Sequence, residues 1–184
     1  MKQINTYINE KLRLSVKPQY TCQPKDWIEL QQIIIDRIKD EGPECDLNDI
    51  DTSKIKDMSN LFNAASFTIF KKFNGDVSQW DVSNVTNMFG MFYECKKFNC
   101  DISRWNVSKV SDTDGMFYDC KNFNCDLSKW DMSNVKDIRW MFEGCKKFNQ
   151  DLDSWNVSNV KYMTSAFKNC PTTPTWYDRK QYDK

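Results

Sequence analysis

The sequence predicts an α/β repeat solenoid, with a short parallel β-sheet on one face, short helices or turns on the other and a helical cap at the N-terminus. The first observation is a period of 25 residues that recurs at four kinds of position. These are Trp80, Trp105, Trp130 and Trp155; Phe92, Phe117, Phe142 and Phe167; Cys95, Cys120, Cys145 and Cys170; and Phe73, Phe98, Phe123 and Phe148. Self-similarity at such a period is typical of a solenoid, whose units are too small to bury their apolar faces alone.

The second observation is a change of periodicity inside each repeat. Residues 98–102 alternate between apolar and polar side chains, which is the period of a β-strand. Strands stacked in this way predict a parallel sheet with about 4.8 Å between coils. Further along, Ser111 or Asp112 suits the N-cap of a short helix over residues 114–118. Each repeat is therefore expected to contain a strand, a turn and a short helix.

Residues 1–45 lack the repeat and are expected to form an N-terminal cap, because the terminal coil of a solenoid needs a cover with a polar outer face. Asp26 favours a helix start and Gly42-Pro43 a stop. One apolar stripe follows from the helical spacing of Trp27, Leu30, Ile34 and Ile38. Two further expectations concern the beginning of the chain: a short strand over residues 12–16, and, as a functional alternative, a docking peptide over residues 1–12.

Residues 46–170 are expected to form five coils. The first coil is degenerate, because Ile50 replaces the tryptophan and an insertion lies near residues 64–69. Four fuller coils follow, and the last ends at Cys170-Pro171. Residues 171–184 are expected to be a C-terminal tail that closes the array.

Composition limits the classes of function. The 184-residue chain has 26 Lys plus Arg and 26 Asp plus Glu, so no net field favours nucleic acid or an anionic membrane. No run of about 18 apolar residues is present, which predicts no membrane insertion, and residues 1–14 lack the apolar segment of a secretory signal. We therefore expect a cytoplasmic or particle-associated protein, with its eight cysteines as buried reduced thiols.

The same composition argues against catalysis. The chain has no histidine, so the commonest general base and metal ligand is missing. Its serines recur at equivalent repeat positions, whereas an active site needs one distinguished constellation. Cys95 and Cys100 have a C-x4-C spacing, but one belongs to the predicted helix and the other to the sheet, so packing is favoured over zinc binding. The sequence predicts no enzyme, no cofactor and no metal site.

The periodic tryptophans, phenylalanines and cysteines are predicted to be structural core. An exposed aromatic platform for sugars is the alternative for the tryptophans, but they recur in every full coil together with the other core positions. Stacked aromatic pairs add about 0.5–1.5 kcal/mol each beyond the area that they bury. Loss of one core tryptophan is therefore expected to unfold most of the array.

The polar face of the predicted sheet is the candidate binding surface. Its residues are Asn74, Asp76, Asn99, Asp101, Asn124, Asp126, Asn149 and Asp151, together with Arg104 and Lys129 beside the tryptophans. These side chains either present a site to a partner, tie neighbouring coils together by lateral hydrogen bonds, or bind calcium through hard oxygen ligands.

Some repeat positions vary from coil to coil. Gln79, Arg104, Lys129 and Ser154 are equivalent, as are Phe89, Asp114, Arg139 and Thr164. Variable side chains on a fixed scaffold are how repeat proteins acquire partner-specific surfaces, although neutral drift gives the same pattern.

The phrases FNGDVSQWDVSNVTNMFGMFYECKKFN and FNQDLDSWNVSNVKYMTSAFKNC resemble the BspA-like family of leucine-rich-repeat-type surface repeats. The resemblance covers about residues 46–170 and implies a right-handed, leucine-rich-repeat-like fold used for adhesion or protein contact. The expected function is a non-catalytic protein–protein interaction or scaffold module, with a protein partner of unknown identity. The alternatives are a structural or accessory component of a phage or virus particle that docks through its N-terminal segment, and a surface adhesin or sugar- or calcium-binding module.

Overall fold

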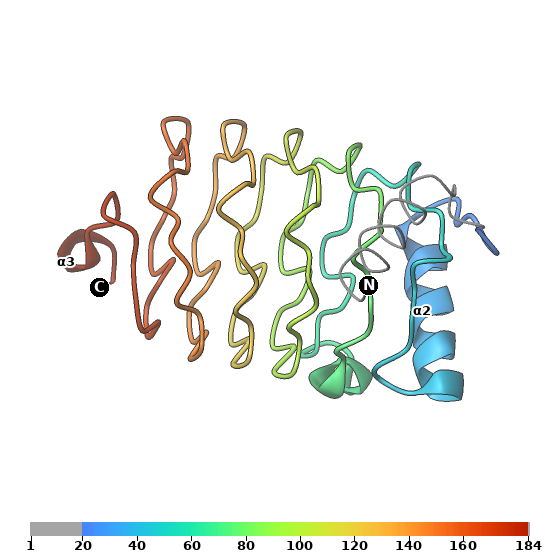
Figure 1. Ribbon diagram of the computed structural model, residues 1–184. Coiled ribbons are helices and arrows are strands. Elements are labelled where there is room, and N and C mark those ends of the chain that lie inside the picture. Colours follow the sequence, from blue (N-terminus) through green and yellow to red (C-terminus); the bar gives the residue numbers. More distant parts are fainter. Residues whose placement is uncertain (1–19, 184) are drawn as a thin grey trace, which may run out of the picture.

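The computed structural model describes residues 20–183 and shows a row of coils stacked side by side between two helices (Figure 1). The α-helix α2 spans Trp27–Glu41, the 3-10 helix η1 spans Thr68–Lys72 and the short α-helix α3 spans Arg179–Tyr182. None of the helices in residues 20–183 is long and apolar enough to cross a bilayer. The expected strand over residues 12–16 and docking peptide over residues 1–12 lie outside the described residues.

Neighbouring coils are paired by isolated β-bridges. The main series of parallel bridges links Asp57, Asn87, Asp112, Asp137 and Tyr162 in turn. No two consecutive residues of the described chain form a strand. The predicted α/β solenoid, with a parallel sheet on one face and short helices on the other, is therefore wrong, and each coil consists of turns.

Side chains take the place of backbone carbonyls where the sheet was predicted. The Asn99 backbone N–H donates to Asn74 Oδ1 at 2.8 Å, and the Ile102 N–H donates to Cys125 Sγ at 3.4 Å. In a parallel ladder these N–H groups would donate to carbonyls of the adjacent strand. The alternating pattern of residues 98–102 is present, but no backbone ladder forms there.

A left-handed backbone interrupts the helix predicted over residues 114–118. Gly115 has φ 61° and Asp119 has φ 53°, and neither value is compatible with a right-handed helix. The N–H groups donate to the next coil instead, from Gly115 to Arg139 O at 2.8 Å and from Phe117 to Met141 O at 2.9 Å. The ordered bonding between coils thus lies on the face that was predicted to be helical.

Each coil closes through a series of i→i+3 turns. In the coil that begins at Phe98, the N–H groups of Trp105, Val110, Met116, Cys120 and Phe123 donate to the carbonyls three residues earlier. Aspartate or asparagine side chains stabilise several of these turns by accepting the N–H two residues later, as Asp101 Oδ1 does from Ser103 and Asp112 Oδ1 from Asp114. The turns point the apolar residues between them inward.

Columns of periodic side chains run through the interior. Each periodic tryptophan donates its indole N–H to a carbonyl of the preceding coil, as Trp105 does to Val77 O at 3.1 Å. Each periodic cysteine thiol does the same, as Cys120 does to Phe92 O at 2.9 Å. The Phe92 and Phe117 rings stack at 5.8 Å and 3°. The residues predicted as core are all 6% exposed or less, namely Trp80, Trp105, Trp130, Trp155, Phe92, Phe117, Phe142, Phe167, Cys95, Cys120, Cys145 and Cys170.

Helix α2 covers the first coil. Asp26 caps its start by accepting the Glu29 N–H, and Gly42, with φ 93°, ends it. The stripe predicted for this helix is buried at Leu30, Ile34 and Ile38, whereas Trp27 is 41% exposed.

The opposite end is covered by residues 176–182, which belong to the expected closing tail. The Trp176 indole continues the tryptophan column by donating to Leu152 O at 3.0 Å. Tyr177 is 5% exposed and packs on Phe167 with ring centroids 5.0 Å apart. The Ser165 N–H donates to Tyr182 O of α3 at 2.7 Å, so that the last coil also has a backbone partner.

Candidate interaction surface

The asparagines of the predicted binding face form a lateral ladder. The side-chain oxygens of Asn74, Asn99 and Asn124 accept the backbone N–H of Asn99, Asn124 and Asn149, respectively, at 2.7–2.9 Å. These amides therefore tie neighbouring coils together, which is one of the roles expected for them.

The aspartates of that face hold turns. The Oδ1 atoms of Asp76, Asp101, Asp126 and Asp151 each accept the N–H two residues later at 2.9–3.0 Å. Hydrogen bonds from Ser103 hold the pKa of the Asp101 carboxyl below its usual value, and those from Ser128 do the same for Asp126. Arg104 and Lys129 are exposed beside the aspartates. The charged side chains of this face thus stay exposed to water, while the Oδ1 atoms of its aspartates stabilise turns of the fold.

Two shallow depressions mark this face. The larger, about 380 Å³, is lined by Glu44, Asn74, Gly75, Asp76, Ser78, Cys100 and Asp101. The second, about 320 Å³, is lined by Asn99, Asp101, Ser103, Cys125 and Asp126. No group of three or more His, Cys, Asp or Glu side chains in residues 20–183 is placed to hold a metal ion.

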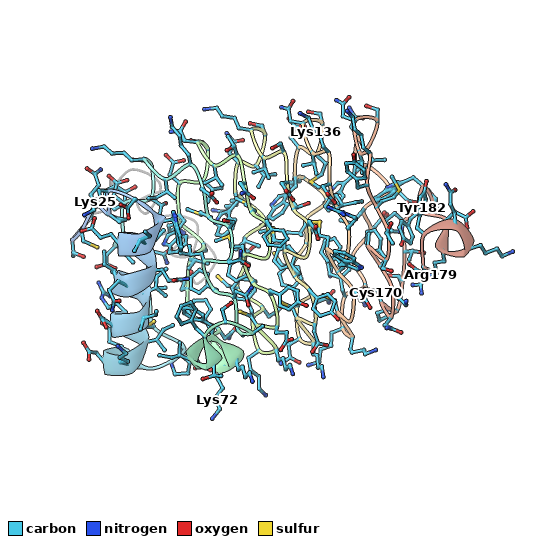
Figure 2. The ribbon with its side chains drawn as sticks, turned by 180° about the vertical axis from the view of Figure 1, so that it is seen from behind. Lys25, Lys72, Lys136, Cys170, Arg179 and Tyr182 are labelled. Carbon is cyan, nitrogen blue, oxygen red and sulfur yellow. The ribbon has the colours of Figure 1, made fainter. Side chains whose placement is uncertain are left out.

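A different group of side chains lies along the series of β-bridges, just past the edge that carries Lys136 in Figure 2. We call it the Arg139 cluster. It consists of Phe89, Asp112, Asp114, Asp137, Arg139, Trp140 and Tyr162, which come from four consecutive coils. The bridges that join Asn87, Asp112, Asp137 and Tyr162 bring these coils side by side.

Arg139 lies at the centre of the cluster. Its Nε donates to Asp137 Oδ1 at 3.0 Å and its Nη2 to Asp137 Oδ2 at 2.6 Å, which is a bidentate pair. The same Nη2 lies 3.2 Å from Asp114 Oδ2. The guanidinium carbon is 5.5 Å from the Trp140 ring centroid and 5.3 Å from that of Tyr162. Arg139 is thus shared between two carboxylates and two aromatic rings.

Asp114 is the least satisfied member. Its side chain is only 7% exposed, and its Oδ1 is buried without a hydrogen-bond partner among residues 20–183. Burial, reinforced by the Asp137 charge, raises the pKa of the Asp114 carboxyl to about 6, although Arg139 opposes this shift. Burial also raises the pKa of Asp112. The carboxylates here are crowded and poorly solvated.

The aromatic members are exposed. Phe89 and Trp140 are each 40% exposed, and Tyr162 is 55% exposed. Trp140 has φ 53°, whereas the equivalent positions in the two preceding coils are Gly90 and Gly115. A bulky residue in the left-handed region is a true outlier and costs about 1–3 kcal/mol. The cluster therefore displays a large side chain at a backbone position that suits it poorly.

Sequence reasoning found only part of this cluster. It singled out Phe89, Asp114 and Arg139 because their repeat position varies. It missed Trp140 and Tyr162, although the replacement of a repeated glycine by tryptophan at residue 140 was a signal in the sequence.

A row of lysines on the edge that carries Lys72 was also missed. It consists of Lys71, Lys72, Lys96, Lys97, Lys121, Lys146 and Lys147, at equivalent positions just before the repeated phenylalanines. Asp119 pairs with Lys96 at 3.6 Å and with Lys121 at 3.8 Å. These ammonium groups are largely solvated, and exposed pairs of this kind contribute about 0–1 kcal/mol.

Comparisons with known proteins place the repeats in a family. The model of the family described as "Mycoplasma protein of unknown function, DUF285" matches residues 37–128 and 65–176. The comparisons with curated proteins and with solved structures found no match.

Proposed function

Since the chain belongs to the DUF285 family of Mycoplasma-type proteins of unknown function, we propose that it is a non-catalytic protein–protein interaction module that binds its partner through the Arg139 cluster. The stack of coils supplies a rigid support, because every coil is bonded to its neighbours through backbone, indole and thiol donors. A rigid surface loses little conformational entropy on binding.

The observation that carries this proposal is Trp140. The fold does not require a tryptophan there, because Gly90 and Gly115 occupy the same conformation in neighbouring coils. Its side chain adds exposed apolar surface and makes the backbone less stable. Tryptophan, tyrosine and arginine are the residue types most enriched at the centres of protein interfaces, and Trp140, Tyr162 and Arg139 lie in contact on one face.

The resemblance of the repeats to BspA-like surface repeats supports the same class of function, since such repeats are used for adhesion or protein contact. The absence of histidine from the sequence and the use of Asp101 and Asp126 as turn acceptors favour a non-catalytic role over an enzyme.

The proposal is tested by affinity purification from the native source with mass spectrometry, followed by measurement of Kd with the purified partner. Four forms of the full chain are compared: wild type, Trp140→Gly, Tyr162→Ser, and the double variant Asp101→Lys/Asp126→Lys as the control for the Asn/Asp face. We expect both single variants to weaken binding by at least about tenfold, which is the size of one interfacial aromatic contact. If the partner is lost only with the double variant, the interface lies on the Asn/Asp face instead. If none of the four forms binds a partner, the proposal is contradicted.

A further inference from the structure

We infer that the Arg139 cluster recognises a basic side chain, lysine or arginine, of a partner protein, and that Asp114 is the residue that receives it. This inference rests on the proposed function and adds the chemistry of the partner.

The charges of the cluster do not balance. Three carboxylates, Asp112, Asp114 and Asp137, face one guanidinium. Arg139 gives its bidentate pair to Asp137 and reaches only Oδ2 of Asp114. The surface therefore keeps negative charge that an additional cation would neutralise, and an acidic partner would be repelled.

Asp114 Oδ1 lacks the donor that a buried oxygen normally has. Leaving such an atom unsatisfied costs about 1–3 kcal/mol, and more for a charged group. The described part of the chain supplies no donor to it, so a donor from outside is the group that would remove this cost. Lysine and arginine carry only donors, and their hydrogen bonds to carboxylates are charge-assisted.

The aromatic residues of the cluster suit a cationic side chain. Trp140 and Tyr162 already hold the Arg139 guanidinium at 5.5 and 5.3 Å, which shows that their rings accept a cation. Phe89 provides an apolar surface for the aliphatic stem that lysine and arginine share. A purely apolar partner would use the rings but would leave Oδ1 unsatisfied.

Asp114 Oδ1 is buried, so a partner reaches it only after neighbouring side chains move. The bridge between Asn87 and Asp112 places Phe89 beside Asp114 on one side, and the ion pair places Arg139 on the other. Phe89 is 40% exposed and the Arg139 side chain 38% exposed. Exposed side chains change rotamer on the picosecond to nanosecond timescale, so the inference requires a rearrangement of side chains at the cluster and no change of the coil backbone.

The Asn/Asp face lacks this combination. Asp101 and Asp126 accept hydrogen bonds at Oδ1, and their carboxylates are exposed to water. A basic side chain that binds there gains only an exposed ion pair, worth about 0–1 kcal/mol. Asp101→Asn is therefore a matched control for Asp114→Asn, since both variants remove one negative charge and keep the shape of the side chain.

The test uses the full chain and an array of ten-residue synthetic peptides with random flanks and a central arginine or lysine. Each peptide has a partner in which citrulline replaces arginine or norleucine replaces lysine, so that the charge is lost and the shape is largely kept. Wild type, Asp114→Asn, Trp140→Gly and Asp101→Asn are compared, and bound peptides are measured again by fluorescence anisotropy. We expect a subset of basic peptides to bind wild type and Asp101→Asn equally, and to lose at least about tenfold in affinity in the other two variants or when the central charge is removed.

Equal binding of charged and neutral peptides, or full binding by Asp114→Asn, would overturn the inference. If no basic peptide binds with a Kd below about 1 mM while a partner protein is still lost with Trp140→Gly, the inference fails and the proposed function stands. If neither peptides nor proteins bind through this face, both fail.

Discussion

Replacement of Asp114 by asparagine is expected to stabilise the protein at neutral pH. Asparagine keeps the size of the side chain and removes a carboxyl group whose pKa burial raises to about 6. The charged and polar groups that act on this carboxyl are Asp112, Asp137 and Arg139, and all three remain in the variant.

The sign follows from proton binding. Between the ordinary value of 3.8 and the pKa of about 6, the folded chain binds more protons at Asp114 than the unfolded chain does. Stability therefore falls as pH rises through this window, and Asp114 destabilises the fold most above it. The full difference of about 2 units corresponds to about 3 kcal/mol, and solvent screening at the edge of the cluster reduces it to about 1–2 kcal/mol.

The assay is urea unfolding followed by tryptophan fluorescence, for wild type and Asp114→Asn, from pH 3.5 to 7.5. We expect equal free energies of unfolding at pH 3.5 and a gain of about 1–2 kcal/mol for the variant at pH 7.5. Asp101→Asn is expected to show the opposite sign, because hydrogen bonds from Ser103 lower the pKa of Asp101. The stability that Asp101 provides is present at neutral pH and is lost as pH falls below 3.8. An Asp114→Asn variant that is less stable than wild type at pH 7.5, or a difference that does not change with pH, would refute this account.

Three further predictions concern stability and reactivity. Trp130→Ala is expected to cost about 3–5 kcal/mol in urea unfolding, whereas Trp140→Gly should change stability by no more than about 1 kcal/mol, because relief of its backbone strain offsets the lost contacts; similar losses would show that Trp140 is structural. Gly75→Ala is expected to cost at least about 1–3 kcal/mol, since the new Cβ would lie 2.5 Å from the carbonyl oxygen of Cys45; an unchanged melting temperature would contradict that geometry. Iodoacetamide at pH 7.5 should label Cys22, which is only partly buried, before the buried thiols Cys95, Cys120 and Cys145, whose pKa burial raises well above its usual value. Mass spectrometry of the peptides would show the order, and early labelling of any of these three would contradict the prediction.

The repeat and helix α2 could be predicted from the sequence, but the pattern of hydrogen bonds could not. Periodicity reports which side chains share a face, and Trp105, Phe117 and Cys120 are indeed 4% exposed or less. It does not report which acceptor each N–H finds. The side chain of Asn74 intercepts the N–H that a strand would have given to a carbonyl, so an alternating pattern was present without a sheet.

The positions with positive φ could be predicted from the sequence only in part. Gly115 and Gly144 are residues that favour positive φ and could have argued against a helix in each repeat. Ser165 and Trp140 carry no such signal, and their conformations follow from their places in the stack. The Arg139 cluster was hidden for a related reason, because Tyr162 comes from the next coil and meets Arg139 only after stacking.

The helices at the two ends of the stack, α2 and α3, cover backbone groups that a further coil would use. A stack of identical coils presents unpaired backbone groups and an apolar surface at each end, and the two ends are complementary to each other. Head-to-tail association of such ends does not close and leads to filaments. In this chain Gln31 of α2 donates to Leu61 O at one end, and Tyr182 of α3 accepts the Ser165 N–H at the other. Addition of a second copy at either end would therefore have to displace α2 from Leu61 O or α3 from the Ser165 N–H.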